Sequence, residues 1–131
     1  MKIYKVIDVG EAQGSVDMQA VKRSGYDGVI IRAGYGNDPS QTDPYFEKNY
    51  ENAMATDLMT GVYWFCYARD CNDAIAEAEA CNQIIKGKIF PLGIYYDYEE
   101  DSIDYMDRCG ANKIDMSESI AAWIQQMSSF G

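Results

Sequence analysis

The chain has 131 residues, of which 47% are hydrophobic, and a formal net charge of −10. This length is enough for one domain with a hydrophobic core, so we predict a single domain over residues 1–131. The acidic excess, with no cluster of Lys and Arg, argues against a nucleic acid partner and against an anionic membrane surface. The absence of histidine excludes Ser-His-Asp and Cys-His catalysis and the histidine-based metalloprotease motif.

The first residues do not form a conventional signal peptide. The segment MKIYKVIDVG carries charge among its apolar residues and lacks a small-residue cleavage site. No stretch reaches the roughly 18 uninterrupted apolar residues that a membrane span needs. The cellular location is therefore not predicted from the sequence, and action outside the cell would require another export route.

Four short apolar runs, rich in β-branched and aromatic residues, are predicted strands. They are residues 3–9, 28–34, 61–68 and 92–98. Segments with helical periodicity follow each of them, and these are residues 16–24, 43–57, 72–87 and 115–130. Asp43 is expected to cap the second helix, with Pro44 at its first position. The stripe Met116, Ile120, Trp123, Ile124 and Met127 is expected to be the apolar face of the last helix.

This order predicts an α/β fold made of parallel βα repeats in four βα units. In such folds the ligand site lies at the carboxyl ends of the strands. Asp8, the segment RAGYG (32–36), Tyr67 and the pair Asp97 and Glu99 all fall at those ends. We therefore expect a site there.

Asp97 and Glu99 end the fourth predicted strand. Residues two apart on a strand face the same side, about 6.6 Å apart along the chain, so the two carboxyl groups are predicted to point together. Such a pair can flank a glycosidic bond, one group as acid and the other as base, nucleophile or stabiliser. Two alternatives remain at this point: an exposed acidic loop that continues through Glu100, Asp101 and Asp104, or a calcium site.

Aromatic residues are abundant, with eleven tyrosines and two tryptophans. Tyr63, Phe65 and Tyr67 are predicted to share one side of the third strand, with Trp64 on the other. Most aromatic residues of a small domain belong to its core, and this interpretation is favoured for Trp64. Tyr67 and Tyr35, at loop edges, are better candidates for stacking on a sugar ring.

Two further patterns do not indicate a functional site. The segment GYGND (34–38) lacks the third glycine of a dinucleotide fingerprint, because position 39 is proline, and it is interpreted as a turn. The four cysteines have no CxxC spacing, so neither a zinc ribbon nor a redox motif is predicted, and buried free thiols are favoured over disulfides.

Taken together, the segments IDVGEAQG, RAGYG, GVYWFCYA and PLGIYYDYEEDS resemble the glycoside hydrolase family 25 lysozymes, which are N-acetylmuramidases that cut peptidoglycan between N-acetylmuramic acid and N-acetylglucosamine. The resemblance runs in order through nearly the whole chain. It implies that Glu99 is the acid that protonates the leaving oxygen. It also implies that Asp97 and Asp8 orient or stabilise the substrate's own 2-acetamido group or the developing positive charge, without metal or cofactor.

The resemblance also suggests residues that contact the glycan. Arg32 is implied to lie in the barrel interior and to pair with one of the three acids. The expected substrate-binding residues are Arg32, Tyr35, Tyr63, Tyr67 and Tyr95. Relatives usually carry Ser and Trp where this chain has Gly10 and Ala12, so an aromatic contact is expected to be missing at that edge.

The family domain is an eight-stranded barrel, whereas four strands are predicted here. Barrels of this type run to about 250 residues, so the chain is expected to form four βα units resembling half of a TIM-like barrel, a truncated domain. The first and fourth strands would be open edges, which favour pairing. The simplest partner is a second copy that completes the barrel as a homodimer. The alternatives to an active enzyme are an inactive fragment and a half-barrel that binds cell-wall glycan without cleaving it.

Overall fold

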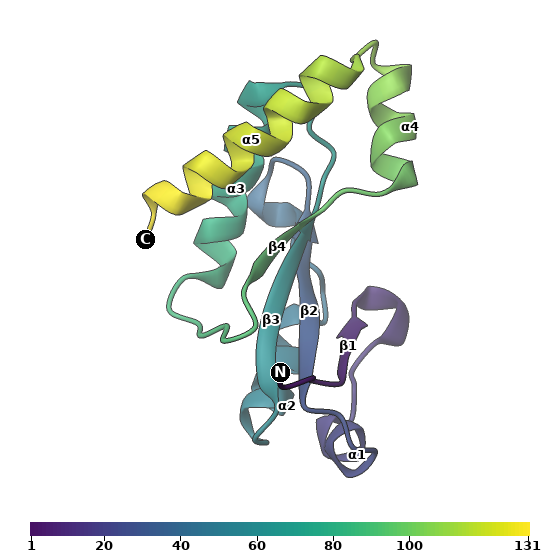
Figure 1. Cartoon of the computed structure of the whole chain (residues 1–131), viewed down its shortest axis with the longest axis vertical. Helices are drawn as coiled ribbons and strands as arrows, with labels where there is room; N and C mark the ends of the chain where they lie inside the picture. The colour runs from purple at the N-terminus through teal and green to yellow at the C-terminus, as the bar shows by residue number, and fades with distance from the viewer. The chain divides into compact units, whose positions relative to one another are not determined.

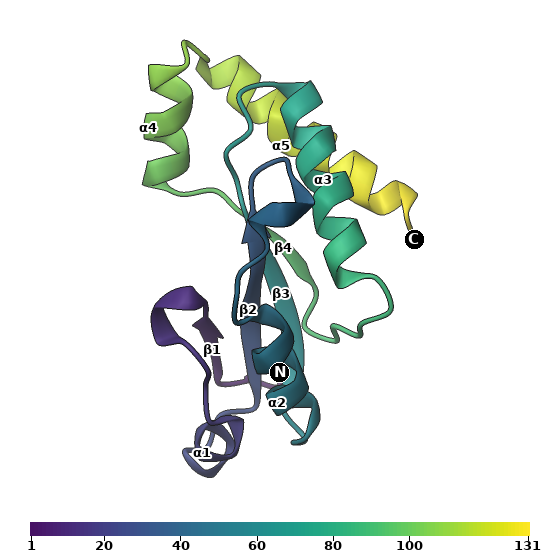
Figure 2. The same cartoon turned by 180° about the vertical axis from the view of Figure 1, so that it is seen from behind.

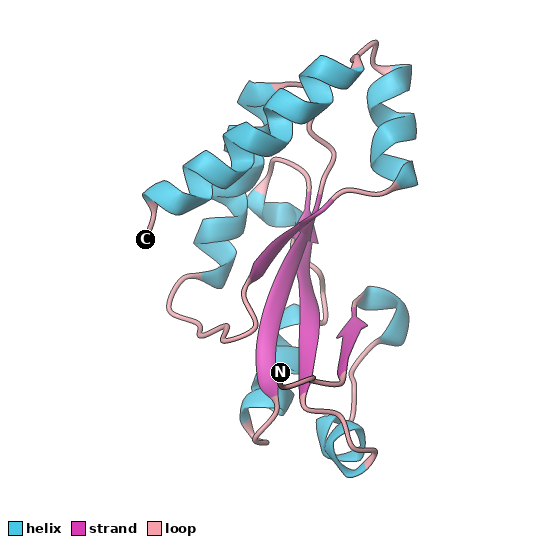
Figure 3. Ribbon diagram, viewed as in Figure 1, coloured by secondary structure: helices cyan, strands magenta, loops and turns pink.

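The computed structural model describes residues 1–131, and strands and helices alternate along it (Figures 1 and 3). The strands are β1 (Val6–Val9), β2 (Gly28–Tyr35), β3 (Met59–Phe65) and β4 (Ile94–Asp97). The α-helices are α1 (Met18–Arg23), α2 (Phe46–Met54), α3 (Cys71–Ile85), α4 (Glu100–Arg108) and α5 (Lys113–Ser129). Two short 3-10 helices, η1 (Glu11–Gln13) and η2 (Pro39–Gln41), follow β1 and β2.

The strands form one sheet in the order β1-β2-β3-β4, so strands consecutive in the sequence are neighbours. β1 and β2 are parallel, with a register that runs from Val6 opposite Gly28 to Val9 opposite Ile31. Each consecutive pair of strands is joined through helix, as the βα pattern predicts. β3 begins two residues earlier than expected because the Met59 N–H already donates to the Asp27 carbonyl at 3.0 Å.

The contacts of the chain gather in two compact units. The first unit comprises Met1–Ala33, Asp43–Tyr63 and Gly87–Tyr95. The second unit comprises Gly34–Thr42, Trp64–Lys86 and Tyr96–Gly131. A single domain over residues 1–131 stays a prediction.

In the first unit, α2 holds the loop that follows β1. Asn49 is almost fully buried, at 1% exposed. Its Oδ1 accepts from the Val16 N–H at 2.8 Å, and its Nδ2 donates to the Gly14 carbonyl at 2.9 Å. One side chain of α2 therefore satisfies two backbone groups more than thirty residues away, in a loop that has no regular structure of its own.

The prediction that Asp43 caps α2 is wrong. The helix begins at Phe46, and Tyr45 occupies the capping position. Asp43 is buried instead, and its carboxylate accepts from the Arg32 Nε at 2.8 Å and from the Tyr45 N–H at 2.9 Å. A buried charge needs a partner of opposite charge, so pairing with Arg32 stabilises the Asp43 carboxylate more than an exposed capping position would.

In the second unit, α3 and α5 lie side by side (Figures 1 and 2). Asp70 starts α3, because its Oδ1 accepts from the Asp73 N–H at 2.9 Å. Small residues of α3, among them Ala74 and Ala78, are buried and allow close packing. Trp123 of α5 is buried as expected, but Ile124, predicted on the same apolar stripe, is 54% exposed.

Helix α4 was missed by the sequence analysis, which considered an acidic loop for Glu100, Asp101 and Asp104. The helix has only nine residues, and of these only Ser102 and Met106 are buried. Its charges nevertheless suit a helix, since Glu100 and Asp101 lie in the first turn and Arg108 in the last. None of the helices combines the length and the apolar character that crossing a membrane requires.

We predict that Asn49→Ala lowers the free energy of unfolding by about 2 to 3 kcal/mol, because two backbone groups lose their partner in a buried place. Urea unfolding followed by circular dichroism measures this. Lys48→Ala, at the exposed neighbouring position of the same helix, should stay within about 0.5 kcal/mol of wild type. Equal effects of the two substitutions would contradict the role of Asn49.

Candidate functional site

The predicted site residues are divided between the two units. Asp8, Arg32, Tyr63 and Tyr95 belong to the first unit, and Tyr35, Tyr67, Asp97 and Glu99 belong to the second. Asp8 is an exposed residue of β1. That Asp8 gathers with Asp97 and Glu99 at one site stays a prediction.

Asp97 and Glu99 are held by different kinds of structure. Asp97 is the last residue of β4, and its carbonyl accepts from the Cys66 N–H at 2.9 Å. Glu99 lies beyond the strand, in extended conformation, at the capping position before α4. Its N–H donates to the Ser102 Oγ at 3.3 Å, and its side chain is exposed. The start of α4, rather than strand pairing, therefore positions Glu99.

Tyr98, between the two acids, is tied to α4. Its hydroxyl donates to the Met106 Sδ at 2.8 Å, and Met106 is fully buried. Burial raises the pKa of the Tyr98 phenol to about 12. The segment that joins Asp97 to Glu99 is thus anchored at its middle residue as well as at both ends.

Arg32, in the first unit, forms an ion pair that the resemblance did not indicate. Its Nε donates to the Asp43 Oδ2 at 2.8 Å, and its Nη2 donates to the Glu11 Oε2 at 3.1 Å. Burial disfavours the charged guanidinium, but the hydrogen bond and the charge of Asp43 outweigh it, so the pKa of Arg32 is raised. A Cβ at Gly10 would come within 3.2 Å of the Tyr63 hydroxyl, so the glycine lets that ring approach the loop closely.

Tyr95 is also held within the first unit. The residue is 47% exposed, and its hydroxyl donates to the Leu92 carbonyl at 2.6 Å. The polar end of this half-exposed side chain is thus already bonded within the first unit.

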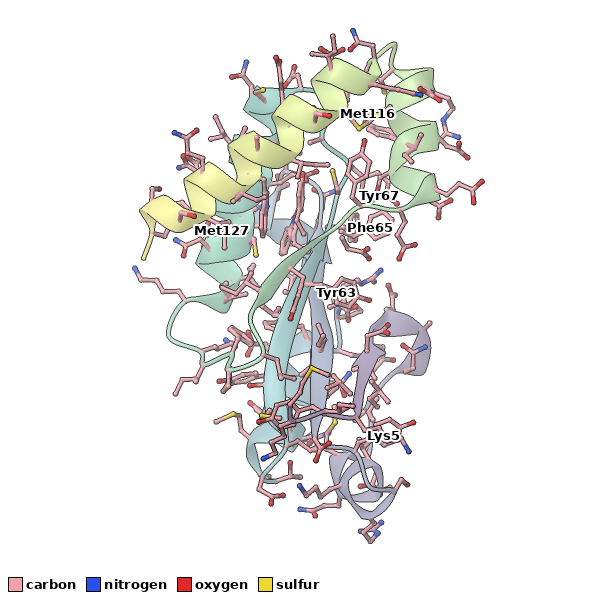
Figure 4. The ribbon with its side chains drawn as sticks, viewed as in Figure 1. Lys5, Tyr63, Phe65, Tyr67, Met116 and Met127 are labelled. Carbon is pink, nitrogen blue, oxygen red and sulfur yellow. The ribbon has the colours of Figure 1, made fainter.

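A cavity of about 240 Å³ lies in the second unit, beyond the ends of β2 and β3. Three of its lining residues are tyrosines, namely Tyr35, Tyr67 and Tyr105. Tyr67 packs edge-on against both of the others, with ring centroids 5.9 Å from Tyr35 and 5.3 Å from Tyr105. Phe65 lies beside Tyr67, at 5.1 Å (Figure 4). The two tyrosines predicted to meet a sugar thus line one cavity.

The cavity also has a charged wall. Arg69 binds Asp73 with two hydrogen bonds, 2.6 Å from its Nε to Oδ2 and 3.2 Å from its Nη2 to Oδ1. The Arg69 guanidinium lowers the pKa of Asp73, so this carboxylate is ionised. Arg69 itself is half exposed. The cavity is thus lined by both aromatic and charged side chains.

Glu77 is the residue of the second unit that the sequence analysis overlooked. It lies on α3, lines the cavity and is 1% exposed. Its two oxygens accept from the Tyr67 N–H at 2.8 Å and from the Tyr96 hydroxyl at 2.5 Å. Burial raises its pKa to about 7, although these donors and Cys66 favour the ionised form. Within the Ala- and Glu-rich helix no local pattern distinguishes it from Glu79, which is exposed.

The cysteines form no disulfide. All four are free, with Cys66 and Cys81 buried and Cys109 exposed, so the expectation of buried thiols is correct for two of them and wrong for Cys109. Burial, more than any charge, raises the pKa of the Cys66 and Cys81 thiols to about 12. No group of three or more Asp, Glu, Cys or His side chains is arranged to hold a metal ion.

Comparison with known proteins gives consistent likenesses. The model of the glycosyl hydrolases family 25 matches residues 7–131. The chain is 33% identical over 108 residues to an autolytic lysozyme of Clostridium acetobutylicum, and the aligned segment covers 82% of this chain and 32% of that protein.

Two solved structures illustrate the likeness in fold. The autolysin LytC of Streptococcus pneumoniae, solved with a synthetic peptidoglycan ligand, has a TM-score of 0.82 at 23% identity, covering 98% of this chain and 30% of LytC. A lysozyme of Streptomyces coelicolor has a TM-score of 0.78 at 21% identity, covering 98% of this chain and 59% of the lysozyme. The predicted fold class, parallel βα repeats resembling half of a TIM-like barrel, is confirmed. The chain spans about a third of the length of the curated relative.

We predict that Glu77 makes stability depend on pH. Its pKa is about 7 in the folded chain against an ordinary value of 4.5, so folding strengthens its hold on a proton. The proton on Glu77 thus stabilises the folded chain. This stabilisation is complete below about pH 4.5 and is lost as the pH rises through 7, a change in the free energy of unfolding on the order of 3 kcal/mol. Glu77→Gln should therefore flatten the fall in unfolding free energy between pH 5 and pH 8.

Urea unfolding at several pH values measures this slope in wild type and variant. Glu79→Gln removes a carboxyl group from an exposed position of the same helix and should keep the wild-type slope. A slope that Glu77→Gln leaves unchanged would show that another group binds the proton.

Proposed function

Because the chain belongs to family 25 of the glycosyl hydrolases, we propose that it acts on bacterial cell-wall peptidoglycan as a lysozyme-type glycosidase. The proposed target is the β-1,4 bond between N-acetylmuramic acid and N-acetylglucosamine. The observation that carries the proposal is the extent of the family match, which includes Asp8, Asp97 and Glu99. Likeness to an autolytic lysozyme supports the same substrate class.

In the proposed reaction Glu99 donates its proton to the glycosidic oxygen as the bond to the anomeric carbon breaks. The oxygen of the substrate's 2-acetamido group forms the new bond to that carbon, while Asp97 and Asp8 stabilise the positive charge that develops. Water then attacks the anomeric carbon, the bond from that carbon to the acetamido oxygen breaks, and one proton of the water goes to Glu99. The exposed position of Glu99 before α4 suits a group that must reach the substrate.

The remaining predicted residues are proposed to hold the glycan. Tyr35 and Tyr67 line the cavity of the second unit and present ring surface to a sugar. In the first unit, Arg32, Tyr63 and Tyr95 are proposed to contact the substrate as well. Arg32 is bound to Asp43 and Glu11, so its guanidinium would be held in place before the substrate arrives.

A homodimer is proposed from the edges of the sheet. β4 ends the strand order, and two apolar residues of this edge strand, Ile94 and Tyr95, are 42% and 47% exposed. An exposed apolar edge strand tends to pair with another strand. A second copy would pair with this edge strand.

We predict that wild type clears a suspension of bacterial cell walls and that Glu99→Gln reduces the rate by at least about 100-fold, because the amide has no proton to donate at neutral pH. Turbidity and the release of reducing ends measure cleavage. Glu100→Gln, the exposed neighbour in the first turn of α4, should retain activity.

The same assay separates the alternatives. Clearing by both wild type and Glu99→Gln would remove Glu99 from its proposed role. Co-sedimentation with cell walls in the absence of cleavage would identify a glycan-binding module, and neither binding nor cleavage would identify an inactive fragment.

We predict a homodimer, seen by size-exclusion chromatography with light scattering as twice the 14.7 kDa of one chain. Ile94→Lys should shift the protein toward monomer, because a charge on an edge strand opposes pairing. Ile124→Lys, at an exposed position of α5, should leave the mass unchanged. A monomeric wild type across the concentration range would contradict the proposal.

A further inference from the structure

Glu77 has a buried carboxyl group for which the proposed reaction has no use. Carboxyl groups are rarely fully buried unless they are paired, and the partners of Glu77 are hydrogen-bond donors rather than cations. An apolar residue of similar volume would fill the same space without the cost of removing a carboxyl group from water. The reason for a carboxyl group here must lie in what it bonds.

The two partners of Glu77 belong to the ends of neighbouring strands. Tyr67, which offers its N–H, comes two residues after β3, and Tyr96, which offers its hydroxyl, is the residue before Asp97 in β4. The sequence neighbours of these two partners are joined by the backbone hydrogen bond from the Cys66 N–H to the Asp97 carbonyl. One side chain of α3 thus clamps both strands beside the bond that holds Asp97.

The clamp has a rigid support on its far side. The Tyr96 ring stacks on the Trp123 ring of α5, with centroids 4.4 Å apart and planes 1° apart. Trp123 is buried, so the Tyr96 ring is fixed by its face and its hydroxyl is fixed by Glu77. Tyr96 therefore has little conformational freedom. Because Asp97 is the next residue along the chain, fixing Tyr96 also restricts the position of the Asp97 backbone.

We propose that Glu77 is a positioning residue, which holds the backbone of Asp97, and through it the segment that leads to Glu99, in the arrangement that cleavage requires. This inference rests on the proposed function. The contact with Tyr96 persists in both protonation states of Glu77, because the carboxylate accepts from the phenol and the carboxylic acid donates to it. Glutamine offers the same pair of bonds, one accepted and one donated, whereas leucine offers neither.

The test compares Glu77→Leu with Glu77→Gln. Loss of the clamp should lower kcat of Glu77→Leu by about 10- to 100-fold with KM nearly unchanged, because small displacements of a catalytic group have effects of this size. Glu77→Gln should keep kcat within about 3-fold of wild type. The matched controls are Glu79→Leu and Glu79→Gln, at an exposed position of the same helix, and both should resemble wild type.

A second readout does not depend on turnover. Amide hydrogen exchange of the Cys66 N–H reports the bond to the Asp97 carbonyl directly, and it should become faster in Glu77→Leu and stay as in wild type in Glu77→Gln. If Glu77→Leu does not fold, Tyr96→Phe replaces it, because the substitution removes the hydroxyl and keeps the ring on Trp123. It should show the same loss of kcat and faster exchange.

The outcomes separate the two proposals. Wild-type kcat in a folded Glu77→Leu, or lost activity with unchanged exchange at Cys66, would overturn the positioning role. If wild type cleaves no peptidoglycan, the proposed function fails, and the exchange of Cys66 still decides whether Glu77 holds Asp97. Faster exchange in Glu77→Leu alone would then support the clamp by itself.

Discussion

The hydrogen bond between the Cys66 N–H and the Asp97 carbonyl is the point on which the site of the second unit depends. It joins the residue that follows β3 to the last residue of β4, where the chain leaves the sheet toward Glu99. Beyond it the chain is held by α4: the Ile103 N–H donates to the Glu99 carbonyl, Ser102 accepts from the Glu99 N–H, and Met106 accepts from the Tyr98 hydroxyl. A site built beyond the end of a strand therefore needs support from helices, and α3, α4 and α5 all contribute to it.

Both units solve the problem of a buried carboxyl group in the same manner. In the first unit Asp43 accepts from two backbone N–H groups and from Arg32. In the second unit Glu77 accepts from one backbone N–H and one phenol. The difference lies in the cation: the charge of Asp43 is matched, whereas burial raises the pKa of Glu77 to about 7. Each carboxyl group connects segments that are distant in the sequence, so each fixes a loop that local structure alone would leave free.

The second unit contains both the acids Asp97 and Glu99, which lie within the family 25 match, and a cavity lined by Tyr35, Tyr67 and Tyr105. The charge pair of Arg69 and Asp73 adds a fixed dipole to that cavity. Hydrogen-bonding and aromatic surfaces of this kind suit the hydroxyl and amide groups of the proposed substrate.

The sequence by itself determined the α/β order, the places of the four strands and the likeness to family 25, because these follow from local periodicity and from motifs read in order. It also placed Asp97 at a strand end. Only the tertiary structure decided that Arg32 binds Asp43, that Asp43 caps no helix and that Glu77 is buried while Glu79 is exposed. The reason is physical: whether a charged side chain is buried depends on donors that folding brings from elsewhere, such as Tyr96, which lies 19 residues from Glu77. The short helix α4 belongs with these, because the burial of its Ser102 and Met106 depends on the elements that cover them.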